Sequence, residues 1–222
     1  MWRDAALVAS KDLRIEARSR VATNQVAPFA ILVLILFAFA LDADPSVLDK
    51  TTAGLFWIAV LFCSLLAVQR SAAIETADGA RDQLRLSGLE PAGVFLGKVV
   101  AVALQLVALE VLLGVGVVIL YNADIRGIPM IVLTCVTATL GLAASGTLYG
   151  SLAGGLKVRE TLLPLLILPV AAPVLLAATK AWQAALSGSP GDGDPWLRLL
   201  AVFAAVYLTF GVLVYGSLLE ES

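Results

Sequence analysis

Glu110 is the residue whose type and position most directly suggest chemistry, because its carboxyl group lies well inside a long apolar run. Gln105 precedes it in the same run by about one and a half helical turns. Holding an ionised carboxylate at the centre of a bilayer costs at least roughly 2.5 kcal/mol, so such a residue often marks an ion or proton pathway. The structural alternative is that Glu110 faces a bundle interior or a protomer interface, where it is hydrogen-bonded or protonated. Ion-coupled transporters carry several such residues in broken helices, and one glutamate does not make that pattern.

Side chains that ligate metals are scarce. Histidine is absent, which removes the commonest ligand of zinc and of haem iron. The two cysteines, Cys63 and Cys135, lie in separate apolar runs and form no CxxC motif, which argues against a disulfide scaffold and against a redox site. The sequence therefore predicts no metal site and no covalently bound cofactor.

A second group of charged residues lies between Gln69 and Lys98, in the one long polar stretch between two hydrophobic runs. Apolar side chains recur there at helical spacing, so residues 74–86 can form an amphipathic helix just below the membrane. Gly79 weakens such a helix by roughly 1 kcal/mol, which suits a segment that a partner orders, although an ordinary solvated loop is equally compatible with the pattern. The residues expected to contact a partner are Glu75, Asp78, Gly79, Arg81, Asp82, Leu84 and Arg85.

The composition places most of the chain in a membrane. Of its 222 residues 60% are hydrophobic and 14% are charged, whereas soluble domains carry roughly 25% charged residues. Too few charges remain to cover a water-soluble surface. The apolar runs show no alternation with a period of two, so the fold class predicted is an all-α polytopic membrane protein.

Six apolar runs reach or approach the roughly 20 residues that a helix needs to cross a bilayer. We expect a membrane domain at 26–219 with a cytoplasmic coupling segment at 70–93. The predicted spans cover about 26–41, 54–73, 94–121, 128–156, 161–182 and 196–219.

The distribution of Lys and Arg predicts the orientation. One side of the bundle receives the cations of the first 20 residues, those of 70–98, and Lys157 and Arg159, while the opposite loops are short and acidic. By the positive-inside rule the first side is cytoplasmic, with both termini inside a bacterial inner membrane. No run is left for a soluble catalytic domain, so the chain is not expected to be an enzyme, and its energy would come from another polypeptide or an ion gradient.

Residues 1–25 are expected to form an interfacial amphipathic helix that lies on membrane lipid, the alternative being a disordered tail. Their charges are spread throughout, unlike those of a signal peptide. One helical face would carry Trp2, Ala6, Ala9, Leu13 and Ala17. The opposite basic face would carry Arg3, Lys11, Arg14 and Arg18.

Two further spans carry helix-modifying residues. Gly146, Gly150 and Gly154 have the four-residue spacing that lets membrane helices approach closely, within the subunit or at a dimer seam. Pro164, Pro169 and Pro173 remove backbone hydrogen bonds from the fifth span and are expected to kink it.

Two motifs together resemble the CcmB family, the membrane permease subunits of the ABC-type complex for cytochrome c maturation. The first is the order Glu-x-x-Asp-Gly followed by Asp-Gln-Leu-x-Leu-Ser at 75–87, with Lys98 opening the next span. The second is Gly155-Leu156-Lys157 followed by the Leu-rich run 161–169 with its spaced prolines. More distantly, the plan resembles ABC-2-type permeases.

The resemblance implies a non-catalytic permease that works as a homodimer with a CcmA-type ATPase, which binds the ATP. It also implies CcmC-type and CcmD-type membrane proteins and a CcmE-type haem chaperone, and no nucleic acid. Haem would be a ligand that is transported or handed over. Without histidine, this chain would meet haem through apolar surface and not by coordination.

Three other functions stay open from the residues. The chain could be an ABC-2 exporter of a lipid, drug or polysaccharide, or a scaffold that assembles a complex without transport. An ion-gradient transporter fits least, because intramembrane charge is nearly absent.

Overall fold

The computed structural model describes residues 1–41, 45–76, 88–123, 125–153 and 159–221. Within these ranges the chain is helical apart from short turns, and no strand occurs, as the composition predicts. The elements are α1 (Trp2–Ser19), the π-helical turn η1 (Ala22–Val26), α2 (Ala27–Ala40), α3 (Pro45–Thr76), α5 (Pro91–Tyr121), α6 (Ile128–Ala153), α7 (Arg159–Leu186), the 3-10 turn η3 (Pro190–Gly193) and α8 (Asp194–Glu221).

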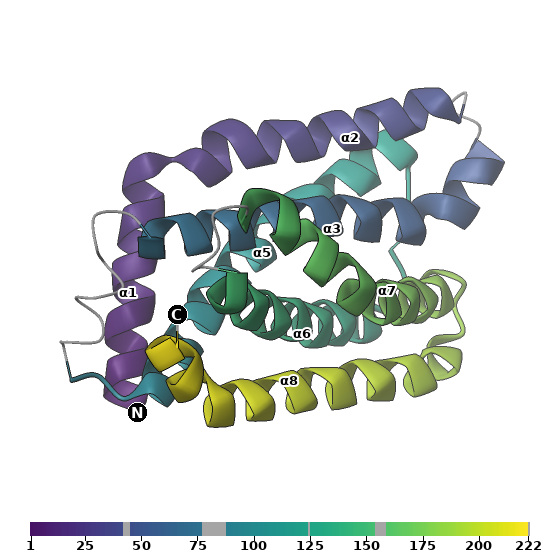
Figure 1. Ribbon diagram of the computed structural model, residues 1–222. Coiled ribbons are helices and arrows are strands. Elements are labelled where there is room, and N and C mark those ends of the chain that lie inside the picture. Colours follow the sequence, from purple (N-terminus) through teal and green to yellow (C-terminus); the bar gives the residue numbers. More distant parts are fainter. Residues whose placement is uncertain (42–44, 77–87, 124, 154–158, 222) are drawn as a thin grey trace.

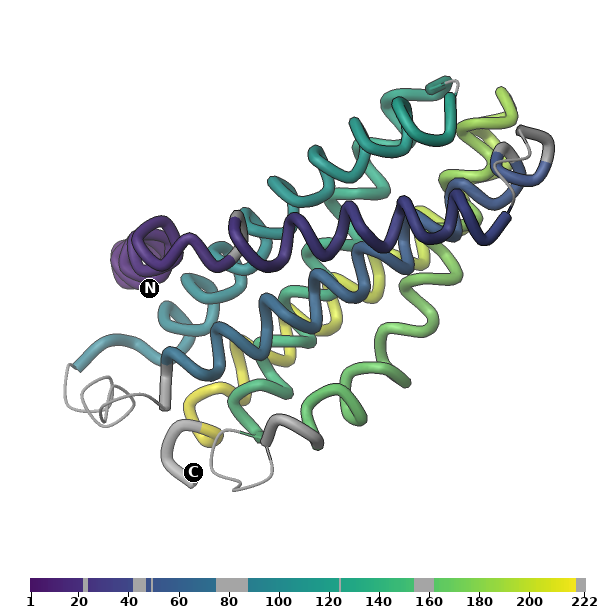
Figure 2. Tube along the Cα trace, turned by 90° about the horizontal axis from the view of Figure 1, so that it is seen from above, coloured from purple at the N-terminus to yellow at the C-terminus, as the bar shows by residue number. Residues whose placement is uncertain are grey.

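Six helices, α2, α3, α5, α6, α7 and α8, run lengthwise through the molecule, and α1 lies across one end of them (Figure 1). The view from above shows the same arrangement, with α1 seen almost along its axis beside the start of α5 (Figure 2). We call this the α1 end of the bundle. The N-terminus and the end of α8 both lie there.

Five helices in the described part of the chain are long and apolar enough to cross a membrane by themselves. Their apolar stretches are Lys50–Ile74, Pro91–Tyr121, Ile128–Ala153, Leu162–Leu186 and Pro190–Leu218. The protein is therefore a polytopic membrane protein. Helix α2 has 14 residues, which rise only about 21 Å. The stretch Asn24–Ala40 reaches the length of a span only when it is taken together with Trp2–Ser19, from which it is bent by 52°. The first predicted span, 26–41, therefore stays a prediction.

Helix α1 ends at a residue whose backbone has a left-handed conformation. Arg20 has a φ of 52°, in the left-handed region, and its N–H donates a hydrogen bond to the Glu16 carbonyl at 2.9 Å. This arrangement caps the last turn of the helix. The chain can then turn from the plane of α1 into the direction of α2.

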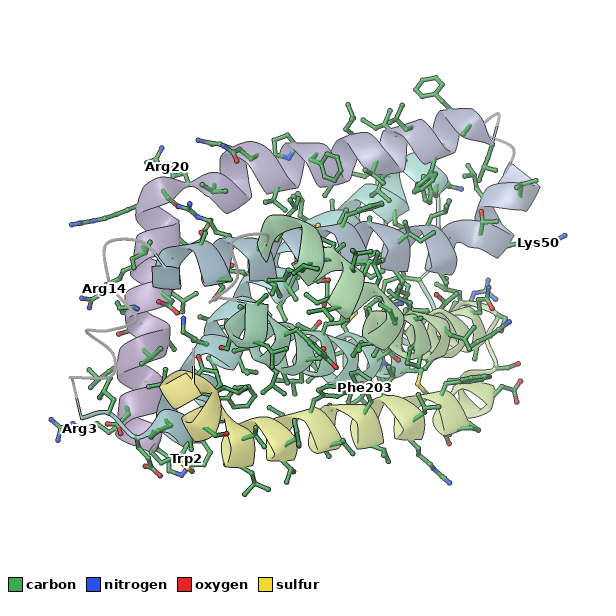
Figure 3. All side chains as sticks on the ribbon, viewed as in Figure 1. Trp2, Arg3, Arg14, Arg20, Lys50 and Phe203 are labelled. Atoms are coloured by element: carbon green, nitrogen blue, oxygen red, sulfur yellow. The ribbon has the colours of Figure 1, made fainter. Side chains whose placement is uncertain are left out.

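Close packing between the long helices depends on small residues. A Cβ at Gly146 of α6 would collide with Val68 of α3, and one at Gly141 would lie 2.8 Å from Phe203 of α8. Figure 3 shows Phe203 between α8 and the bundle interior. The close approach at Gly146 is thus a contact within the subunit, whereas Gly154 lies outside the described residues.

Helix α7 stays helical across Pro164, Pro169 and Pro173. Figures 1 and 2 show that its axis curves along its length. Proline interrupts the hydrogen-bond ladder and crowds the preceding turn, which accounts for curvature in such a segment. The role of these three residues as functional kinks stays a prediction.

Candidate functional site

The candidate site is the junction where α1 packs across the start of α5. Gly93 and Gly97, one turn apart on α5, face the α1 backbone. A Cβ at Gly93 would lie 2.8 Å from the Met1 carbonyl oxygen, and one at Gly97 would lie 2.6 Å from that of Ala5. Small residues at this spacing let two helix backbones approach without side chains between them, so α1 is held close against α5.

The buried face of α1 carries acids. Ala5, Val8 and Ala9 are buried there, together with Asp12 and Glu16. Buried carboxylates need opposite charges or hydrogen-bond donors, because an unpaired buried charge is strongly unfavourable. A cation on α5 meets this need for Asp12, and a cation on α3 meets it for Glu16.

Asp12 pairs with Lys98 of α5. The Lys98 ammonium lies 3.3 Å from Asp12 Oδ2, and only 1% of Lys98 is exposed. The other oxygen, Oδ1, faces the exposed Lys11 ammonium at 3.0 Å. The sequence analysis identified Lys98 only as a residue near the start of a predicted span. In the structure Lys98 is buried and pairs with an acid 86 residues away in the sequence.

Two further contacts extend this junction along α1. Glu16 Oε2 lies 3.9 Å from Nε of Arg70 on α3, and Asp4 Oδ2 accepts a hydrogen bond from the Glu90 backbone N–H at 3.3 Å. Glu90 is the N-cap of α5, where a carboxylate also meets the positive end of the helix dipole. Together Asp4, Asp12 and Glu16 connect α1 to both helices that flank residues 77–87.

The predicted coupling residues can be placed only in part. Glu75 belongs to the penultimate position of α3, and Asp78, Gly79, Arg81, Asp82, Leu84 and Arg85 lie outside the described residues. Their role stays a prediction. What the structure adds is that the helix ends on both sides of them are attached to α1.

The outer face of α1 keeps the basic residues at the surface. Arg3, Lys11, Arg14 and Arg18 are all exposed, and Arg3 and Arg14 point away from the bundle in Figure 3. Of the apolar face, Trp2 is 75% exposed, Leu13 is half-buried and Ala9 is buried. The apolar face as a whole therefore does not pack on the bundle, and its insertion into lipid stays a prediction.

Sequence reasoning missed the acidic face of α1. Asp4, Asp12 and Glu16, together with Val8, recur every four residues on a helix whose other charges are basic. Four-residue spacing places side chains on one helical face, so the pattern did signal a face with cationic partners. It could not tell which cations these were, because Lys98 and Arg70 come from distant parts of the chain.

Glu110 lies in the bundle interior. It is 5% exposed, and Oε1 accepts a hydrogen bond from the Thr139 hydroxyl of α6 at 2.5 Å. The Cys135 thiol is a second hydrogen-bond partner. Both partners are neutral groups, which matches the structural alternative for this residue. Gln105 is not part of the cluster, since it lines a shallow outer groove with Leu13 of α1.

No group of three or more His, Cys, Asp or Glu side chains within the described ranges could hold a metal ion. The charges of the α1 junction are instead used in pairs between helices. These pairs attach α1 to α3 and α5.

Comparison with known proteins decides the family. The sequence profile described as CcmB protein matches residues 3–221. The chain belongs to the CcmB family. The match begins within α1, so the family likeness includes the helix that carries the acidic face as well as the membrane-spanning helices.

Individual CcmB relatives match over most of their length. Heme exporter protein B of Pseudomonas aeruginosa is 30% identical over 208 residues, covering 93% of both chains. Heme exporter protein B of Escherichia coli K12 is 31% identical over 217 residues, covering 87% of both. The Haemophilus influenzae protein of the same name is 29% identical over 187 residues, covering 84% of this chain and 85% of the relative. The resemblance predicted from the 75–87 motif and the fifth span is thus confirmed.

Proposed function

We propose that this CcmB-family protein is the membrane subunit of an ABC-type haem exporter complex for cytochrome c biogenesis. It would couple ATP hydrolysis in a partner chain to haem delivery, or to release of a haem-loaded chaperone. The observation that carries the proposal is the attachment of α1, through Asp12 and Glu16, to both helices that flank residues 77–87. Relatives that carry the name heme exporter protein B support the haem assignment.

The coupling step would begin on the segment 70–93. An ATPase that binds this segment in two different ways would favour one position of its flanking helices, because only differential contacts shift an equilibrium. The pairs Lys98–Asp12 and Arg70–Glu16 would carry that shift to α1. Helix α5 would carry it into the membrane, where Glu110 meets α6 through Thr139.

The α1 end of the bundle would be cytoplasmic. Arg3, Arg14 and Arg20 project at this end, and Lys50 projects at the opposite end (Figure 3). An excess of Lys and Arg on the cytoplasmic side is the general rule for membrane proteins. This orientation would place both termini and the segment 70–93 within reach of a cytoplasmic ATPase.

The partners that we expect are those that membership of the CcmB family implies. A CcmA-type ATPase would hold the ATP, and this chain would catalyse no reaction. CcmC-type and CcmD-type membrane proteins and a CcmE-type chaperone would be further partners, with two copies of this chain per complex. Haem would be a ligand that is passed on through apolar contacts.

Charge reversal in the coupling segment tests the proposal. In Glu75→Lys/Asp78→Lys we expect loss of ATPase co-purification and of cytochrome c maturation in a strain that depends on this chain. Asp192→Lys/Asp194→Lys, at the other end of the bundle, is the matched control and should leave both unchanged. Full co-purification and maturation in the Glu75/Asp78 variant would refute coupling through this segment. A static scaffold, by contrast, would show no ATP-dependent change in the accessibility of α1.

A further inference from the structure

A cleft of about 800 Å³ lies between α2, α3 and the start of α7. It shares Arg70 with the α1 junction and lies apart from the Glu110 cluster. Most of the described wall is apolar, and the polar side chains among its described residues are one arginine and two glutamines. The lining consists of Val21, Gln25, Val26, Phe29, Phe62, Leu65, Leu66, Gln69, Arg70, Ala73, Leu163 and Pro164.

The cleft extends over one leaflet of a bilayer. Along α3 it reaches from Phe62 to Ala73, a rise of about 16 Å, which is about half of a hydrocarbon core of roughly 30 Å. Phe62 lies at the middle of the apolar stretch Lys50–Ile74. Arg70 lies about 12 Å further toward the α1 end, close to the depth of lipid headgroups.

Aromatic rings form the deep part of the wall. Phe29 of α2 and Phe62 of α3 meet edge to face with their centroids 6.1 Å apart. They remain 41% and 40% exposed, so their faces are available to an acyl chain. The deep end therefore suits a hydrocarbon tail.

The shallow end suits an anion. Nε of Arg70 is buried and has no hydrogen-bond partner among the described residues, and its ion-pair partner Glu16 is 3.9 Å away. A guanidinium has five N–H donors, so Arg70 retains donors for a second acceptor. Gln25 and Gln69 line the same end. Among the lining residues that the structure describes, Arg70 carries the one charge and none is a carboxylate, so this part of the wall favours an anionic headgroup over a zwitterionic one.

We propose that this cleft binds one anionic phospholipid from the leaflet in which α1 lies. The phosphate meets Arg70, with the amides of Gln25 and Gln69 beside it, and one acyl chain runs along Phe29 and Phe62. The site needs no ATPase and does not depend on what the complex transports.

Lipid binding would compete with the α1 attachment. Arg70 is the residue through which α3 meets Glu16 of α1, and a phosphate is a strong bidentate acceptor for arginine. A bound headgroup therefore weakens the Arg70–Glu16 pair. The occupied cleft favours a looser α1, and the empty cleft favours a tightly attached one.

Native mass spectrometry of the purified full-length chain tests the site. The probes are phosphatidylglycerol and phosphatidylcholine with identical acyl chains. We expect one phosphatidylglycerol per chain, bound at least about 10-fold more tightly than phosphatidylcholine, which is about 1.4 kcal/mol, because only the anionic lipid brings a net negative charge to the Arg70 guanidinium. Arg70→Gln removes this preference, while Arg18→Gln, an exposed cation at the same end, keeps it.

Two more variants keep the test decisive if Arg70→Gln fails to fold. Glu16→Gln leaves Arg70 without its acidic competitor, so phosphatidylglycerol affinity rises several-fold. Leu66→Trp fills the cleft with Arg70 intact, so binding is lost. The proposal is overturned if both lipids bind equally, if Arg70→Gln and Arg18→Gln behave alike, or if haem added as a second probe displaces the lipid. A dimer in which a second copy fills the cleft and excludes lipid also overturns it.

Discussion

The Lys98 ammonium group lies 3.3 Å from Oδ2 of Asp12, and both side chains are buried at the junction of α1 with α5. A lysine that is only 1% exposed loses almost all of its hydration, and the carboxylate restores part of that energy. Such a pair adds little net stability, but removing one member is costly because it leaves the other charge buried without a partner. Here the pair joins α1 to α5.

Removing one member of this pair should be far worse than removing both. Lys98→Met leaves Asp12 as a buried charge without its main partner, and we expect destabilisation of about 3–5 kcal/mol. The double variant Asp12→Leu/Lys98→Met should recover most of that loss, because an apolar pair replaces the ionic one. Thermal unfolding of the detergent-solubilised protein would measure both.

The control for this pair is Lys11→Met. Lys11 also contacts Asp12 but is exposed, so its loss should change stability by less than about 1 kcal/mol. If the double variant were as unstable as Lys98→Met, the buried charge would not be the cause.

A methyl group at Gly97 should displace α1. The Cβ of Gly97→Ala would lie 2.6 Å from the Ala5 carbonyl oxygen and 2.7 Å from Val8 Cβ, and backbone cannot move aside as a flexible side chain can. We expect a loss of about 1–3 kcal/mol and faster amide hydrogen exchange in α1. Exchange measured by mass spectrometry on peptides from residues 2–19 would report this directly.

Gly114→Ala is the matched control in the same helix, because a Cβ there meets nothing within 4 Å. It should leave α1 exchange unchanged and can stabilise α5, since alanine is the better helix former by up to about 1 kcal/mol. Equal exchange in the Gly97 and Gly114 variants would contradict the close packing of α1.

The long apolar helices were predictable from the sequence, and the α1 junction was not. Each of the five described helices that are long and apolar enough to cross a membrane overlaps a predicted span, because the bilayer sets the length of apolar run that such a helix needs. The start of α3 shows the limit: the helix begins at Pro45, although the apolar run begins only at Gly54. Its first two turns include Asp49 and Lys50. The length of an apolar run cannot predict helical turns that extend beyond the apolar core of the membrane.

Gly93 and Gly97 have the same four-residue spacing as Gly146 and Gly150, but close helix packing was predicted only for the second pair. Gly93 and Gly97 lie near the start of α5, close to Pro91, and small residues at such a position also suggest a turn. Their partner is α1, and the contact joins residues more than 80 positions apart. Such pairings depend on the folded arrangement and not on local pattern.

Replacing Glu110 by glutamine distinguishes a structural from a proton-carrying role. Glu110→Gln retains a carbonyl oxygen that can accept the Thr139 hydrogen bond, so we expect near-normal stability and normal cytochrome c maturation. Glu110→Leu leaves the Thr139 hydroxyl and the Cys135 thiol without this acceptor, and should cost about 1–3 kcal/mol. A folded Glu110→Gln protein that failed in maturation would instead point to proton transfer.

The packing of α6 on α3 can be tested by a pair of glycines in one helix. A Cβ at Gly146 would collide with the Val68 side chain, whereas at Gly150 the nearest atoms, on Val68 and Ala72, are 3.6 and 3.7 Å away. Gly146→Ala should therefore destabilise by about 1–3 kcal/mol, and Gly150→Ala should be tolerated. Val68→Ala removes the colliding methyl groups, so it should rescue Gly146→Ala in a double-mutant cycle of thermal stability. Additive losses in that double variant would mean that Gly146 and Val68 do not meet, and that the small-residue pattern of α6 serves another surface.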